Sequence, residues 1–243
     1  MIVTWNVRSF NQKVKHKELR LFIKRNKVNL IAIYEHRVRD DRASIIIKKN
    51  MAGWNWCTHE SNNVRGRIWV IWNPNEVTFT RKEDAVQYIH GLIMIKQSNI
   101  QFQFTAVYGL HTIATRLPLW TAIKQLNNNI NEPWLIMGDF NSILTQRDRP
   151  GGSPVQDIEI RDFRECLLDC NLAELQIEGR EYTWTNGHVY SQIDKAIANA
   201  AWMDIMPTQV MAIEPLFSDH SPLGLIVEDK GTIRKDHFVS TIV

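Results

Sequence analysis

The sequence predicts an α/β fold in which two mixed β-sheets pack face to face, with helices on their outer surfaces. Several short runs are apolar throughout, as expected for strands that are covered on both faces. Helical patterns follow strands in each half of the chain, yet too many strands are consecutive for a simple doubly wound sheet. The 243 residues contain no repeat and no linker that would divide them.

The first half of the chain alternates strands and helices before a series of consecutive strands. Residues 2–6 form an apolar strand, and the spacing of Leu19, Phe22 and Ile23 predicts a helix over 16–26. The other predicted elements of this half are a strand at 29–35, a helix at 42–50 and strands at 67–72, 77–80, 88–96 and 101–108.

The second half contains two amphipathic helices, another buried strand and a hairpin. The predicted elements are a helix at 117–129, a strand at 133–139, a helix at 158–169 and strands at 182–185, 190–197, 209–214 and 222–227. Residues 150–154 are typical of an exposed loop, and Asn186-Gly187 is a strong hairpin turn signal. Residues 228–243 show no periodicity, so we expect a loose C-terminal tail after a single domain over 1–227.

Composition and charge narrow the class of protein. The formal net charge of +3 permits nucleic acid as a partner without requiring it. Three cysteines without a paired CxxC pattern argue against zinc and against a disulfide framework, which favours a reducing compartment. The N-terminus shows no signal peptide and no apolar run could span a membrane, so we expect an intracellular protein that is neither secreted nor membrane-bound.

Polar residues follow several of the apolar strands at the point where each strand ends. Asn6, Glu35 and Asp139 each close such a run, and Asn141 follows the third. Asp219 and His220 form a further acid–imidazole pair. Because these groups come from distant segments but occupy similar places in the fold, we expect them to share one cleft. Oxygen ligands for Mg²⁺ and a group that transfers protons are what metal-assisted phosphodiester hydrolysis needs.

An ordered set of motifs resembles the endonuclease/exonuclease/phosphatase superfamily, which includes deoxyribonuclease I. The motifs are Trp5-Asn6-Val7-Arg8, Glu35, Val107-Tyr108-Gly109, Gly138-Asp139-Phe140-Asn141, Tyr182-Thr183-Trp184, Ile193-Asp194 and Ser218-Asp219-His220-Ser221-Pro222. The closest resemblance is to the endonuclease domain of plant LINE-type non-LTR retrotransposons. Supporting segments are Trp69 to Pro74, Arg116 to Trp120, Arg149 to Gly152 and Ile193 to Ala196.

The resemblance implies a four-layered α/β-sandwich like that of deoxyribonuclease I and a Mg²⁺-dependent hydrolase, with Mn²⁺ as a possible substitute. It implies that Glu35, Asn6 and Asp219 hold the metal. The implied catalytic residues are Asp139, Asn141, His220, Tyr108 and Asp194. Asp139 or His220 would act as the base, and Asp194 would orient the histidine.

We expect the substrate to be the phosphate backbone of DNA, contacted by Arg8, His111, Thr183, Ser218, Arg147 and Arg149. Thr183 and Ser218 match family positions, the arginines lie in basic loops, and histidine can donate to a phosphate. Two positions depart from the family pattern. His111 stands where relatives usually carry asparagine, and His36 follows Glu35 where threonine is more common.

The leading interpretation is a monomeric endonuclease that nicks duplex DNA and leaves a 3′-hydroxyl, located in the nucleus if it is functional. No reverse transcriptase motif follows the nuclease motifs, so we expect no such domain. Two alternatives remain open at this point. One is a phosphatase with the same fold, and the other is a weakened nuclease that only binds nucleic acid.

Overall fold

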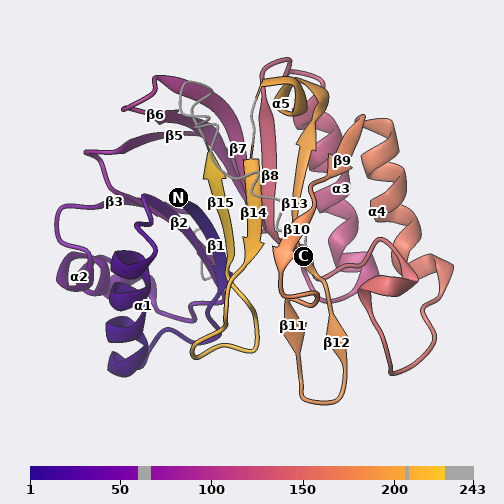
Figure 1. The fold of residues 1–243 in the computed structure, drawn as a ribbon, viewed down its shortest axis with the longest axis horizontal. Coiled ribbons are helices and arrows are strands. Elements are labelled where there is room, and N and C mark those ends of the chain that lie inside the picture. The colour runs from indigo at the N-terminus through magenta and orange to yellow at the C-terminus, as the bar shows by residue number, and fades with distance from the viewer. Residues whose placement is uncertain (60–66, 206–207, 228–243) are drawn as a thin grey trace, which may run out of the picture.

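Two β-sheets pack face to face in the middle of the molecule, and helices cover their outer surfaces (Figure 1). The computed structural model describes residues 1–59, 67–205 and 208–227. The arrangement has four layers in the order helices, sheet, sheet, helices. The sandwich predicted from the sequence is therefore confirmed. None of the helices in the described ranges is long and apolar enough to cross a membrane.

The first sheet has seven strands in the order β10-β14-β15-β1-β2-β4-β3. Their bounds are β1 Ile2–Asn6, β2 Leu30–Tyr34, β3 Asn55–Thr58, β4 Ile68–Trp72, β10 Ile177–Gly179, β14 Thr208–Ala212 and β15 Leu223–Val227. The central strands β1 and β2 are parallel, with Asn6 opposite Tyr34 at their ends. Asn6 and the residue after Tyr34 therefore reach the same edge of the sheet.

The second sheet has six strands in the order β5-β6-β7-β8-β13-β9. Their bounds are β5 Val77–Ala85, β6 Tyr88–Ile95, β7 Ile100–Tyr108, β8 Trp134–Asp139, β9 Leu172–Glu174 and β13 Asp194–Asn199. Here β7 and β8 are parallel and end together at Tyr108 and Asp139, while antiparallel β13 begins at Asp194 opposite Asp139. A separate hairpin of β11 (Trp184–Thr185) and β12 (Tyr190–Ser191) extends beyond the body of the molecule (Figure 1).

Each sheet has its own helices on its outer face. The molecule therefore has three apolar cores, one between the two sheets and one between each sheet and its helices. The helices are α1 Lys13–Arg25, α2 Asp40–Asn50, α3 Ile113–Asn127, α4 Asp157–Asp169, the short α5 Ala200–Ile205 and the 3₁₀ turn η1 Gln146–Asp148. Leu19 and Phe22 of α1 pack with Ile33 on the outside of the first sheet. Ile123 of α3 and Phe163 of α4 pack on the outside of the second.

The central strands are apolar throughout because both of their faces are buried. In β2, Tyr34 points into the layer between the sheets, whereas Ile33 points toward α1. Both side chains are fully buried. A strand with one solvated face would instead alternate between apolar and polar residues. This explains why uninterrupted apolar runs predicted a doubly covered sheet.

The structure differs from the sequence prediction mainly at the ends of elements. Helix α3 begins at Ile113 instead of 117, because Thr112 and Thr115 form a capping box that starts the helix earlier. The strand expected at 190–197 is divided, since β12 pairs with β11 whereas β13 pairs with β8 and β9. The short elements β3, β9, β10, η1 and α5 were not predicted. The expected tail at 228–243 lies outside the described residues.

Candidate active site

The side chain of Asn6 joins two carboxylates that come from different strands. Its Nδ2 donates to Oε1 of Glu35 at 3.1 Å and to Oδ2 of Asp139 at 2.9 Å. Asn6 and Asp139 are fully buried, and Glu35 is 7% exposed. Asn6 ends β1 of the first sheet, Glu35 directly follows β2 of the same sheet, and Asp139 ends β8 of the second. The facing sheets therefore bring these three groups, 133 residues apart in the chain, to one point.

Glu35 is held in its ionised form by donors on several sides. Its backbone is left-handed, with φ 47°, directly after β2. Tyr108 donates its hydroxyl to Oε1 at 2.9 Å, and Nη2 of Arg37 lies 3.3 Å from Oε2. Burial would raise the pKa of Glu35, but the hydrogen bonds from Asn6 and Tyr108 and the nearby Arg8 charge lower it below its usual value. The carboxylate is therefore a charged oxygen ligand at neutral pH.

Asp139 is anchored by the residue two positions further on. The backbone N–H of Asn141 donates to Oδ1 at 2.9 Å, and the Asn141 amide donates to the carbonyl of Gly109 at 2.8 Å. Complete burial and the charge of Asp194 raise the pKa of Asp139, although His220 and Asn6 oppose that rise. An aspartate with a raised pKa accepts a proton more readily than an ordinary one.

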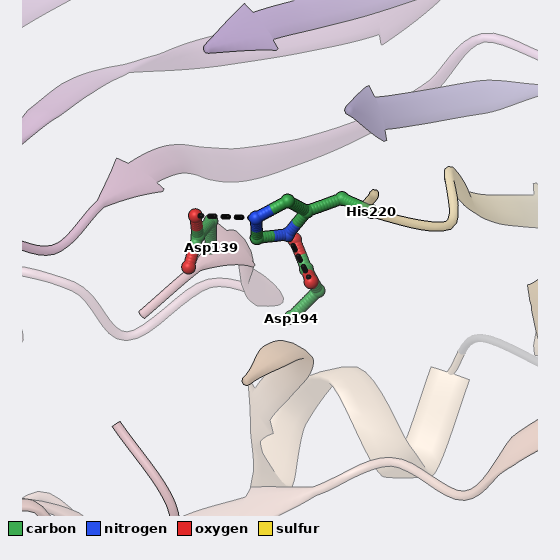
Figure 2. A group of neighbouring side chains, drawn as sticks. All are labelled: Asp139, Asp194 and His220. Carbon is green, nitrogen blue, oxygen red and sulfur yellow. Dashed lines mark hydrogen bonds and ion pairs between the residues drawn. The ribbon is translucent and has the colours of Figure 1, made fainter. Parts of the chain in front are cut away.

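The imidazole ring of His220 lies between the carboxylates of Asp139 and Asp194 (Figure 2). Its Nδ1 is 2.9 Å from Oδ2 of Asp194, and its Nε2 is 3.9 Å from Oδ2 of Asp139. Burial by itself would lower the pKa of His220, but the two carboxylate charges outweigh it and raise the pKa to about 9. His220 therefore carries a positive charge at neutral pH, with both nitrogens acting as donors.

Two buried or half-buried hydroxyl groups lie behind this pair. Thr183 accepts from the backbone N–H of Asp194 at 3.0 Å. Ser218 donates to the carbonyl of Asn6 at 2.6 Å and accepts from the backbone N–H of His220 at 3.2 Å. Thr183 and Ser218 thus fix the backbone of site residues. Thr183 is only 1% exposed and does not line the cleft, so it supports the site from behind.

Arg8, Asp219 and Trp184 form the rim of the site. Oδ2 of Asp219 accepts from Nε1 of Trp184 at 3.0 Å and lies 3.3 Å from Nη1 of Arg8. The same arginine reaches toward Glu35, with Nε 3.9 Å from Oε2. The role of Trp184 could not be predicted, because nothing in the sequence indicates its contact with Asp219, 35 positions away.

The two histidines that depart from the family pattern have different surroundings. Nε2 of His111 is 3.4 Å from the Tyr108 hydroxyl, so His111 belongs to the site. Arg116 fixes its backbone by donating to the His111 carbonyl at 2.9 Å. His36 instead stacks on Trp69 at 4.0 Å in the outer core, and its Nδ1 accepts from the backbone of Val38.

A cleft of about 760 Å³ opens beside the buried groups. Arg8, His111 and Asn141 of the site line it, together with Trp184 and Val189 of the hairpin. Residues 152–154 of the loop and Glu159 of α4 also line it. The cleft therefore connects the catalytic groups with the hairpin, the loop and the start of α4.

Arg147 and Arg149, two of the three arginines predicted to bind phosphate, differ in whether their charge is already paired. Arg149 forms two bonds to the Glu159 carboxylate, at 2.7 and 3.0 Å, so its charge is already balanced. Arg147 is exposed on η1 and does not line the cleft. The Arg149–Glu159 pair has no signal in the sequence, because Glu159 lies in a helix whose orientation only the fold determines.

Two groups of side chains could bind a divalent cation. Asp139, Asp194 and His220 offer ligand atoms within 4.8 Å of one another. However, His220 and Asp194 already satisfy each other by a hydrogen bond. Glu35 and Asn6 offer carboxylate and amide oxygens without an imidazole, which is the donor chemistry that Mg²⁺ and Mn²⁺ prefer. The residues present therefore fit a hard divalent cation.

Comparison with known proteins decides the family. Residues 3–220 match the model of the Endonuclease/Exonuclease/phosphatase family. The chain belongs to the endonuclease/exonuclease/phosphatase family. Enzymes of this family hydrolyse phosphodiester or phosphate ester bonds and depend on a divalent metal ion. The resemblance inferred from the sequence motifs is therefore confirmed at the level of the family.

Several solved structures share the endonuclease/exonuclease/phosphatase fold. The 3′ phosphatase NExo from Neisseria, bound to a product DNA hairpin, is 18% identical with a TM-score of 0.70, covering 93% of this chain and 98% of that one. The endonuclease domain of TRAS1, a telomere-specific non-LTR retrotransposon, is 13% identical with a TM-score of 0.69, covering 92% and 95%. A mannosyl-6-phosphatase from Bacteroides thetaiotaomicron is 12% identical with a TM-score of 0.65, covering 94% and 99%. These similarities show a common fold.

Proposed function

We propose that this protein is a Mg²⁺-dependent endonuclease that nicks duplex DNA and leaves a 3′-hydroxyl, as the endonuclease part of a LINE-type polyprotein would. The observation that carries the proposal is the convergence of Glu35, Asp139 and the Asp194–His220 pair beside a cleft that opens toward the hairpin. A DNA duplex needs such an open cleft, since its backbone must pass across the site on both sides of the cleaved bond.

Glu35 and Asn6 are the residues that would hold the metal ion. Glu35 is the principal ligand because its pKa is lowered and its carboxylate is charged. Asn6 would join through its amide oxygen, which accepts from the backbone N–H of Arg8 at 3.2 Å in this structure. When bound, Mg²⁺ would supply positive charge that stabilises the negative charge developing on the phosphate oxygens.

His220 and Tyr108 would bind the scissile phosphate. His220 is positively charged at neutral pH because Asp194 and Asp139 raise its pKa. Burial and the Glu35 charge raise the pKa of Tyr108, so its hydroxyl stays protonated and can donate a hydrogen bond. Both groups are fixed in place by carboxylate partners, which suits them to stabilise a transition state without rearrangement.

Asp139 would accept the proton of the attacking water, because a protonated His220 cannot. Asn141 holds Oδ1 of Asp139 and lines the cleft, so it can help to orient the water. The water oxygen forms a bond to phosphorus, and the bond between phosphorus and the 3′ oxygen breaks. The 3′ oxygen takes up a proton from solvent and leaves as the 3′-hydroxyl, while the phosphate stays on the 5′ side and Asp139 returns its proton to solvent.

The experiment is a nicking assay on supercoiled plasmid with Mg²⁺. We expect Glu35→Gln and Asp139→Asn each to lower the nicking rate by at least about 100-fold, and EDTA to abolish nicking. Asp169→Asn is the matched control, since this exposed carboxylate pairs only with Lys124 in the described contacts at the far end of α4. The site assignment is wrong if either site variant nicks as fast as the parent.

Hydrolysis of phosphomonoesters without nicking would favour a phosphatase, and DNA binding without hydrolysis would favour a weakened nuclease.

A further inference from the structure

Arg8 lies between two carboxylates that come from different parts of the fold. Its guanidinium group is 3.9 Å from Glu35 on one side and 3.3 Å from Asp219 on the other. Nε of Arg8 is buried and has no hydrogen-bond partner among the described residues. The guanidinium group thus occupies the space in which a second cation could be shared by Glu35 and Asp219.

Asp219 and Glu35 both face protein donors, but the donors at Oδ2 of Asp219 and at Oε1 of Glu35 differ in charge. Oδ2 of Asp219 faces both Trp184 and Arg8, and the Ser218 hydroxyl lies 3.4 Å from Oδ1. Oε1 of Glu35 instead accepts from two neutral donors, the Tyr108 hydroxyl and the Asn6 amide, which also donates to Asp139. A cation bound to Oε1 of Glu35 and to Asn6 competes only with neutral donors, namely the Tyr108 hydroxyl, the Asn6 amide and the backbone N–H of Arg8. A cation at Asp219 has to displace a guanidinium group that is permanently charged.

We propose that Arg8 takes the place of a second divalent cation, so that the site binds one metal ion at Glu35 and Asn6. Asp219 then serves to position Arg8 and is not itself a metal ligand. This inference rests on the proposed function, because it assumes the metal site of the hydrolase. The guanidinium group carries one positive charge where a second divalent cation would carry two, so it repels a metal ion at Glu35 and Asn6 less strongly.

The test counts Mn²⁺ ions bound to the whole chain without DNA, by electron paramagnetic resonance and by titration calorimetry. We expect one ion per chain in the parent. Asp219→Asn keeps one ion with an affinity within about threefold of the parent, whereas Glu35→Gln weakens binding by at least about tenfold. Two ions in the parent, or an Asp219→Asn variant as weak as Glu35→Gln, would overturn the proposal.

Arg8→Gln supplies an independent test, since it removes the charge but keeps a polar side chain. We expect this variant to bind two Mn²⁺ ions, and the double variant Arg8→Gln, Asp219→Asn to bind one. Arg20→Gln is the control, because this exposed arginine contacts Asn50 far from the site. If a folded Arg8→Gln variant binds only one Mn²⁺ ion, the proposal is wrong. If this variant does not fold, the number of ions bound by the parent and the affinity of Asp219→Asn test the proposal instead. Unchanged Mn²⁺ binding in Glu35→Gln would instead refute the proposed metal site itself.

Discussion

His220 is the residue whose ionisation depends most on its neighbours. It is 1% exposed, so without partners it would be neutral at pH 7. Asp194 lies 2.9 Å from one ring nitrogen and Asp139 lies 3.9 Å from the other. These charges reverse the effect of burial and raise the pKa of His220 to about 9. The folded protein therefore holds a proton that the unfolded chain releases at a lower pH.

This difference predicts how stability depends on pH. Because the folded pKa is raised, the stabilisation by protonated His220 is fully present below about pH 6.5, the ordinary value, and is lost as the pH rises through about 9. Relative to His220→Gln, we expect the free energy of unfolding of the parent to fall by up to about 3 kcal/mol across this window.

Urea denaturation at several pH values between 6 and 10, with EDTA present, measures this effect. His188→Gln is the matched control, since His188 is exposed on the hairpin, and it should follow the parent. Parallel curves for the parent and His220→Gln would show that the histidine does not hold its proton in the folded state.

Sequence alone could locate the charged centre of the site but not its rim. Asn6, Glu35 and Asp139 were predictable because each ends an apolar strand, and parallel strands end at a common edge. The partners of Arg149 and Asp219 were not predictable. Both Glu159 and Trp184 reach these residues through the placement of a helix and a hairpin, which no local pattern encodes.

At the scale of elements, strand β8 depends on a glycine immediately before its catalytic aspartate. Gly138 has φ 149°, a conformation that residues with a side chain rarely adopt. A Cβ atom there would lie 2.1 Å from the carbonyl of Val107 and 2.6 Å from the Tyr34 hydroxyl. Both obstacles are fixed, one in strand β7 and the other by its own hydrogen bond to Met137. The glycine therefore allows the two sheets to approach each other beside the site.

Gly138→Ala is expected to lower the free energy of unfolding by roughly 3–5 kcal/mol, or to prevent folding, because it combines strain with a backbone clash. Gly53→Ala is the matched control. Gly53 also has a positive φ, at 81°, but a Cβ atom would meet nothing within 4 Å, so a loss of only about 1 kcal/mol is expected. Urea denaturation compares the two variants. Equal losses would mean that the contact with Val107 and Tyr34 is unimportant.

The elements themselves were predictable in proportion to their length and burial. The long apolar strands β2 and β8 were found because both of their faces are covered. The strands β3, β9 and β10 were missed because they have only three or four residues and lie at or near sheet edges. Their structure depends on pairing with a neighbour and not on their own pattern.

At the scale of the whole molecule, the site exists only because two sheets are packed together. The first sheet and the segment that follows β2 contribute Asn6 and Glu35, and the second contributes Tyr108, Asp139 and Asp194. Neither sheet alone could form the site, because Glu35 is bound by Asn6 from the first sheet and by Tyr108 from the second. The resemblance to a family predicted that these residues meet in one site. Periodicity and spacing predicted only that the ends of neighbouring strands lie at a common edge.

The distribution of charge over the molecule predicts how DNA binding depends on salt. The net charge is only +3, so attraction to DNA must come from a few local cations and not from the molecule as a whole. Arg149 contributes little, because Glu159 balances it inside the cleft. Arg147 is exposed on η1 and forms no ion pair among the described contacts, so its charge is available to a phosphate.

We therefore expect the logarithm of the binding constant to fall with the logarithm of salt concentration with a slope of about −3, measured by fluorescence anisotropy in EDTA. Arg147→Gln should make the slope shallower by about one, because it removes one phosphate contact. The double variant Arg149→Gln, Glu159→Gln removes no net charge and should keep the slope of the parent. If the double variant loses as much slope as Arg147→Gln, then Arg149 leaves Glu159 to bind DNA. In that case the charge balance within the cleft changes when the substrate arrives.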